Sequence, residues 1–168
     1  MSWFTSVFGT KQSWEDEWAK NIYEALVEKG GPGADAFDAM ELKIKIGDLE
    51  KFSKKERLRL EILCLVCLST VAVKAGGKFS KVPFAFGRLL NEKWRERGIY
   101  LPNDEYDIAE KCFDDYEKFL EKPIKWCGEW LSEFYETDDE VNSHRILFTD
   151  HCLKQAKAVQ MTVEGFVS

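Results

Sequence analysis

The chain has 168 residues, of which 45% are hydrophobic, so it is long and apolar enough for one domain with its own core and is not an intrinsically disordered protein. Its five cysteines are odd in number and irregularly spaced, which argues against a disulfide framework, and its first residues lack the pattern of a secretory signal, so we expect a cytoplasmic protein. The net charge of −6 is unevenly distributed, because residues 43–97 carry fourteen Lys/Arg against six Asp/Glu, whereas residues 103–140 carry four against fourteen.

Residues 1–12 form a short apolar segment that contains Trp3, Phe4 and Phe8. This segment could pack on the core of the domain, serve as a contact arm for a partner, or insert at a membrane surface. Membrane-surface helices usually carry Lys or Arg on their polar side, and here only Lys11 follows, so packing on the protein's own core is the favoured interpretation.

The first helix is predicted to begin after Ser13, whose side chain can cap it. Apolar side chains then recur every four residues, which indicates one buried helix face: Trp14, Trp18, Ile22 and Leu26. The glycine-rich residues 30–33 predict the loop that ends this helix.

Residues 34–52 fit two kinds of structure. The alternation of apolar and charged residues over positions 40–46 has the period of a half-buried strand, whereas Phe37, Met40 and Ile44 fit a helix face equally well. We expect a helix or an irregular segment here, with a short β-ribbon near 40–46 as the alternative.

A central helix is predicted over about residues 53–75. Residues 62–73 contain no charge, and twelve helical residues extend about 18 Å, which is too short for a bilayer core of about 30 Å. Ser53 and Glu56 have the spacing of a capping box that would start the helix, and Gly76 with Gly77 would end it. We expect residues 58–73 to be almost entirely buried.

Three further stretches complete the predicted bundle. A helix within residues 80–97 would have Pro83 in its first turn. Asn103 is predicted to cap the next helix, which Pro123 ends or kinks, and that helix has a heptad-like apolar seam: Tyr106, Ala109, Phe113, Tyr116 and Leu120. An apolar face with Cys127 and Trp130 continues in the helix that follows.

The last helix is predicted to open with a capping box formed by Thr137 and Glu140, and to fray after Met161. Its expected buried side includes His144, Phe148 and Cys152. Together these elements predict an all-α fold, a compact bundle of about six helices around the buried central helix, in a single domain that spans residues 1–168.

No motif for catalysis or cofactor binding is found. Cys64 and Cys67 have C-x-x-C spacing, but they lie in the middle of an apolar helix, which predicts core cysteines and not a redox or zinc pair. The alternative to a protein-binding function is a metal- or ligand-binding bundle, or an enzyme, with a site near Glu140, His144 and His151. The two histidines are about 10.5 Å apart along a helix, so they are badly placed to share one ion.

Nucleic-acid binding is not favoured, since the chain is acidic overall. The cations that could serve it fall into two groups: Lys51, Lys54, Lys55, Arg57 and Arg59, and Arg88, Lys93, Arg95 and Arg97.

The favoured prediction is a non-catalytic protein that binds another protein with a basic surface, as an inhibitor of the immunity type or as a subunit of a complex. Acidic side chains interspersed with aromatic ones can steer a basic partner and anchor it. The predicted contact residues are Asp107, Asp114, Asp115, Glu117, Glu133, Tyr135 and Glu136. Membrane contact through Trp3, Phe4 and Phe8 is a further alternative.

Overall fold

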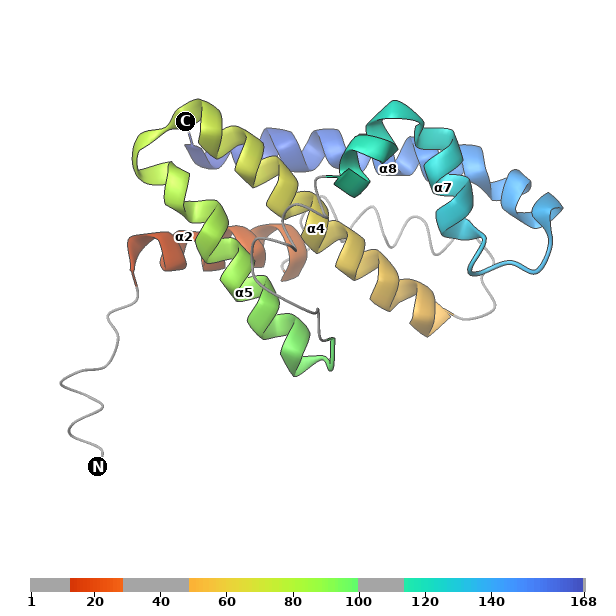
Figure 1. Ribbon diagram of the computed structural model, residues 1–168, viewed down its shortest axis with the longest axis horizontal. Helices are drawn as coiled ribbons and strands as arrows, with labels where there is room; N and C mark the ends of the chain where they lie inside the picture. The colour runs from red at the N-terminus through yellow and green to blue at the C-terminus, as the bar shows by residue number, and fades with distance from the viewer. Residues whose placement is uncertain (1–12, 29–48, 100–113, 168) are drawn as a thin grey trace.

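The computed structural model describes residues 13–28, 49–99 and 114–167, and every regular element in these ranges is helical (Figure 1). The elements are α2 (Trp14–Tyr23), η1 (Glu24–Glu28), α4 (Leu49–Ala75), η2 (Gly77–Lys81), α5 (Val82–Glu96), a helical stretch over 114–121, α7 (Pro123–Leu131) and α8 (Asp138–Val167). The predicted all-α bundle is confirmed. The alternative β-ribbon at 40–46 and the apolar segment 1–12 lie outside the described residues.

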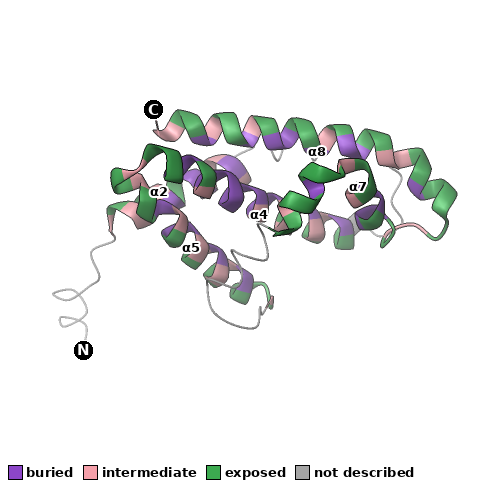
Figure 2. Cartoon of the chain, turned by 45° about the horizontal axis from the view of Figure 1, so that its top comes forward, coloured by how far each residue is buried: buried purple, intermediate pink, exposed green. Residues whose placement is uncertain are grey.

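Two long helices organise the bundle. α4 packs against α8 and α5, while α2 packs against α5 and α7 packs against α8. Buried residues gather on α4 and on the sides of the other helices that face the interior, as the colouring of Figure 2 shows. Among the described helices, none combines the length and the apolarity needed to cross a bilayer.

Several predicted helix starts are confirmed. The Ser13 hydroxyl accepts a hydrogen bond from the Asp16 N–H at 3.3 Å, so Ser13 caps α2. Thr137 and Glu140 form the predicted reciprocal cap of α8, because each side chain accepts a hydrogen bond from the other residue's N–H at 3.2–3.3 Å. Pro83 and Pro123 occupy the first turns of α5 and α7.

The predicted central helix is confirmed, but the capping box proposed for its start is not. α4 spans Leu49–Ala75, so Ser53 lies inside the helix and not at its N-terminus, and Glu56 is buried against Arg59, one turn further along the helix. The expectation of near-complete burial over 58–73 is also wrong at Thr70, which is exposed, and at Val73, which is 83% exposed. These residues are three positions apart and lie on the outward side of α4, whereas Val71 and Ala72 between them are buried.

Two later expectations also need correction. The seam of the helix before Pro123 uses Phe119, which is buried against the Trp126 ring at 5.3 Å, while Leu120 is 53% exposed. Breaking the helix at Pro123 lets α7 fold back onto Phe119. The last helix does not fray after Met161: it continues to Val167 because Val163 is fully buried in the core.

The core consists of two clusters of buried side chains. The first joins α2, α5, most of α4 and the C-terminal part of α8, and includes Tyr23, Leu68 and Trp94. The second lies where the start of α4 meets α7 and the first half of α8, and it is mainly aromatic, with Phe52 in contact with the rings of Trp130, Phe134 and Phe148. α4 and α8 contribute to both clusters.

Candidate functional site

An open groove of about 650 Å³ lies beside the second cluster, between the first half of α4, the helical stretch 114–121 and α7. We call it the α4–α7 groove. Its apolar lining consists of Leu58, Ile62, Trp126 and Trp130. The groove therefore has aromatic and aliphatic surface in an otherwise charged region of the chain.

Two of the predicted acidic residues line the α4–α7 groove and hold its aromatic side chains. Asp115 accepts a hydrogen bond from the Trp126 indole N–H at 3.2 Å. Glu133 pairs with Lys55 at 2.5 Å, and the ammonium of Lys55 lies 4.8 Å from the centre of the Trp130 ring. These carboxylates contribute to the construction of the groove as well as to its charge.

Lysines also line the groove, which the sequence interpretation did not anticipate. Lys118, Lys122 and Lys125 all border it, and Lys125 lies 4.0 Å from Glu129. The walls therefore mix both signs of charge, although residues 103–140 are strongly acidic in total. Lys118 lies before the break at Pro123 and Lys125 after it, so helical spacing alone would not have placed these lysines on one side.

The other predicted acidic residues are exposed on the surface near the groove. Asp114, Glu117 and Glu136 are all exposed, and none makes an ion pair with another described residue. Asp107 lies outside the described residues. The predicted contact set is thus divided between the wall of the groove and the surface around it.

Tyr135 is half-buried and does not stand out as an exposed anchor. Its ring stacks on His144 with a centroid distance of 5.1 Å, and its buried hydroxyl has no hydrogen-bond partner in the described structure. Burial raises the pKa of this phenol to about 12.

The residues of the alternative metal site have other roles. The Glu140 carboxylate accepts hydrogen bonds from the N–H groups of Glu136 and Thr137, both at 3.2 Å, so it serves as a helix cap. His144 stacks on Tyr135, and His151 lies beside the Phe148 ring. Within the described ranges, no group of three or more potential metal-ligating side chains is assembled.

A buried ion pair lies beneath the floor of the groove. Arg59 binds the Glu56 carboxylate through two nitrogens and donates a further hydrogen bond to the Gln155 side chain on α8. Burial by itself would lower the pKa of Arg59. Neighbouring groups that include Glu56 outweigh this effect, so the pKa is raised. Since only the edge of Arg59 reaches the groove, this cation supports the floor and is already paired.

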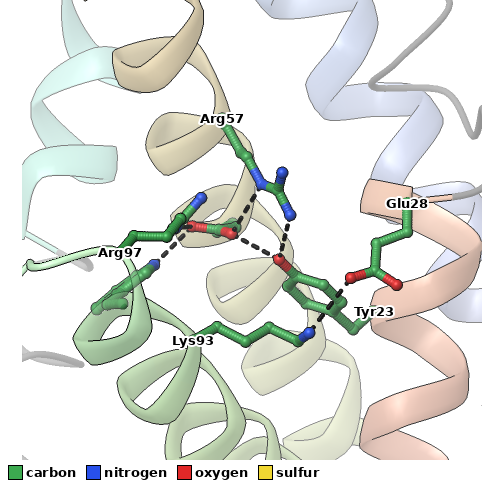
Figure 3. A network of polar contacts seen from close by, with 7 residues as sticks. Tyr23, Glu28, Arg57, Lys93 and Arg97 are labelled. Atoms are coloured by element: carbon green, nitrogen blue, oxygen red, sulfur yellow. Dashed lines mark hydrogen bonds and ion pairs between the residues drawn. The ribbon is translucent and has the colours of Figure 1, made fainter.

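A second polar network lies in the first cluster, on the other side of α4 (Figure 3). The Glu61 carboxylate is fully buried and accepts hydrogen bonds from the Tyr23 hydroxyl at 2.7 Å, the Trp94 indole at 2.5 Å and Arg97 at 2.5 Å. Arg57 adds an ion pair at 3.5 Å. Because its partners come from α2, α4 and α5 and from the residue that follows α5, this carboxylate joins those elements and offers no free face to a ligand.

In the described part of the chain, ion pairs occupy seven of the nine cations considered for nucleic-acid binding, and three of these are Lys54, Lys55 and Arg59. Arg57 and Arg97 bind Glu61, while Lys93 pairs with Glu28 and Arg88 with Asp16. Their charges are therefore engaged in interactions that hold the helices of the bundle together.

The C-x-x-C cysteines are core residues, as predicted. Cys64 and Cys67 are buried in α4, and burial raises the pKa of both thiols, that of Cys67 to about 12. A different pair, Cys127 and Cys152, lies close together between α7 and α8. Residue spacing does not reveal this pair, because its members are 25 positions apart and belong to different helices.

Comparison with known proteins adds no family to this picture. No protein-family model, curated protein or solved structure matches the chain.

Proposed function

We propose that this protein acts by binding another protein, as an inhibitor or a subunit of a complex, and that the α4–α7 groove with its acidic surroundings is the binding surface. The observation that supports this proposal is the aromatic-lined groove of about 650 Å³, bordered by charged residues of both signs. Protein interfaces commonly place aromatic side chains at the centre and polar side chains at the rim.

The charges around the groove favour a partner with a basic surface. Asp114 and Glu117 are exposed beside it, and neither is neutralised by a cation among the described residues. Such carboxylates keep their charge available, and charge complementarity mainly raises the rate at which a partner finds the surface. Asp115 has a different role, since it is bound to Trp126.

The test is a pair of variants with the same change in net charge. Asp114→Lys with Glu117→Lys reverses two carboxylates beside the groove, whereas Glu92→Lys with Glu96→Lys reverses two exposed carboxylates on α5. The partner is captured from a lysate with the wild-type chain, purified, and titrated against both variants at low and high salt.

We expect the first variant to weaken binding about tenfold or more at low salt, with a smaller effect at high salt, and the second to leave it nearly unchanged. Asp115 is left intact so that the aromatic lining is not disturbed. Equal affinity for the two variants would reject the acidic surface near the groove as the contact site.

A further inference from the structure

Two thiols from different helices meet in the second cluster. Cys127 on α7 and Cys152 on α8 are both free, both have 0% of their surface exposed, and both belong to the same group of buried side chains. Gly128 leaves room for the Arg145 side chain of α8, because a Cβ at this position would lie 2.8 Å from its Cδ.

The surroundings of this pair differ from those of the other buried thiols. A hydrogen bond from Cys152, together with the charge of Arg59, holds the pKa of Cys127 below its ordinary value although burial opposes the shift. Burial and the same hydrogen bond raise the pKa of Cys152. These opposite directions distinguish the pair from Cys64 and Cys67, because burial raises the pKa of both of those thiols.

A small cavity reaches Cys152. It has a volume of about 30 Å³, and Arg59 and Trp126 are among the residues that border it. Since both of these residues also line the α4–α7 groove, the cavity adjoins the groove. Its lining is mostly apolar, and a space of this volume holds one molecule about as large as water.

We propose that Cys127 and Cys152 form a redox-modification site, at which a small hydroperoxide of the size of hydrogen peroxide oxidises the two thiols to a disulfide. This proposal does not depend on the proposed protein-binding function. It rests on the meeting of two thiols from different helices, the cation beside them and the cavity at Cys152.

The reaction can be written with its atoms and charges balanced. The Cys152 thiol loses its proton as its sulfur attacks one oxygen of the peroxide, the O–O bond breaks, and the departing hydroxide takes up that proton and leaves as water, so that Cys152 becomes a sulfenic acid. The Cys127 thiol then loses its proton as its sulfur attacks the Cys152 sulfur, the S–O bond breaks, and the departing hydroxide takes up that proton and leaves as a second water. Two sulfurs are oxidised and one peroxide is reduced to water.

Peptide mapping of the full wild-type chain tests the proposal. The protein is treated with hydrogen peroxide, unfolded in the presence of an alkylating reagent, and digested with trypsin. Cleavage after Lys and Arg places Cys127 in peptide 126–145, Cys152 in peptide 146–154, and Cys64 with Cys67 in peptide 60–74. The proposal predicts that peptides 126–145 and 146–154 are recovered as one crosslinked species, whereas peptide 60–74 is still alkylated at both cysteines.

Variants provide the matched control. Cys127→Ala and Cys152→Ala should each abolish the crosslinked species, while Cys64→Ala with Cys67→Ala should leave it in place. If an alanine variant fails to fold, the wild-type map still decides the question. Full alkylation of Cys127 and Cys152 after peroxide treatment, or oxidation of peptide 60–74 before them, would overturn the proposal.

Discussion

The two clusters of the core satisfy their polar groups to different degrees. We call the first cluster with its Glu61 network the Glu61 half, and the second cluster with the α4–α7 groove the groove half. In the Glu61 half, a buried carboxylate has four partners. In the groove half, three buried polar atoms have no hydrogen-bond partner among the described residues: the Tyr135 hydroxyl, Arg145 Nε and His151 Nε2.

This difference agrees with the proposal that the α4–α7 groove is the binding surface. Buried polar groups are almost always paired, and each exception in a native protein calls for an explanation. The α4–α7 groove, the small cavity at Cys152 and a further hollow beside Arg145 of about 740 Å³ all belong to the groove half. The proposed binding surface and the proposed redox site therefore both lie in the groove half, whereas the Glu61 half serves as the framework.

The largest effect is expected when the framework loses its carboxylate. Glu61→Gln replaces one carboxylate oxygen with an amide NH2 group, which would face the N–H donors of Trp94 and Arg97. It also leaves the arginine charge uncompensated. Breaking a buried pair in this way should lower the free energy of unfolding by about 3–5 kcal/mol. Urea denaturation measures the change.

The control for this prediction is Glu50→Gln, which breaks the exposed pair between Glu50 and Lys54 and should cost less than about 1 kcal/mol. If Glu61→Gln costs no more than Glu50→Gln, the Glu61 network does not hold the framework together.

A smaller loss is expected in the aromatic packing of the groove half. Phe52→Leu keeps an apolar side chain but removes the ring that contacts Trp130, Phe134 and Phe148, so we expect a loss of about 1–3 kcal/mol. Phe84→Leu is the matched control, since Phe84 is 55% exposed and should tolerate the change within about 0.5 kcal/mol. Similar losses for both variants would show that the aromatic cluster adds no stability of its own.

The cap of α8 should contribute about 1 kcal/mol. Thr137→Ala removes the hydroxyl that accepts the Glu140 N–H, and loss of such a cap lowers stability by about 0.5–2 kcal/mol. Ser143→Ala, at an exposed position inside the same helix, removes a hydroxyl that donates to the Asp139 carbonyl and should change stability little. Thermal melts followed by circular dichroism compare the two, and a cap effect no larger than the control would be evidence against the assigned helix start.

The smallest effect concerns acid. Burial lowers the pKa of His151, so the folded chain binds fewer protons there than the unfolded chain, in which the pKa of histidine is about 6.5. The stability linked to His151 is complete above about pH 6.5 and is lost as the pH falls below it, by at most about 1.4 kcal/mol per pH unit.

Substitution tests this dependence. His151→Phe removes the titrating group and the unpartnered nitrogen beside Phe148, so the variant should lose less stability than the wild type between about pH 7 and pH 5. Parallel slopes for the two proteins in urea denaturation would contradict the assignment.

Local features of the fold were predictable from the sequence, and the correct predictions share a cause. Ser13, Thr137 and Pro123 act within one helical turn, so their neighbours in the sequence contain the needed information. The apolar run in α4 was identified for the same reason, because a stretch without charge requires burial whatever surrounds it.

The errors and omissions involve partners that are distant in the sequence. Glu56 has the spacing of a capping box with Ser53, but the structure buries it against Arg59, which in turn reaches Gln155, 96 positions away from it. Glu61 directly precedes the uncharged run 62–73, yet Tyr23 and Trp94 allow it to be fully buried. The groove and the Cys127–Cys152 pair likewise depend on which helices pack together, which residue spacing alone does not specify.

The continuity of α8 has a consequence for how ligands can be detected. This helix has 30 residues, is about 45 Å long, and contributes side chains to both halves of the core, as α4 does. Because α4 and α8 run through both halves, one half cannot unfold without breaking helices that the other half needs. The chain should therefore unfold in one cooperative step. A ligand held only in the α4–α7 groove would then raise the melting temperature of the whole molecule, the Glu61 half included.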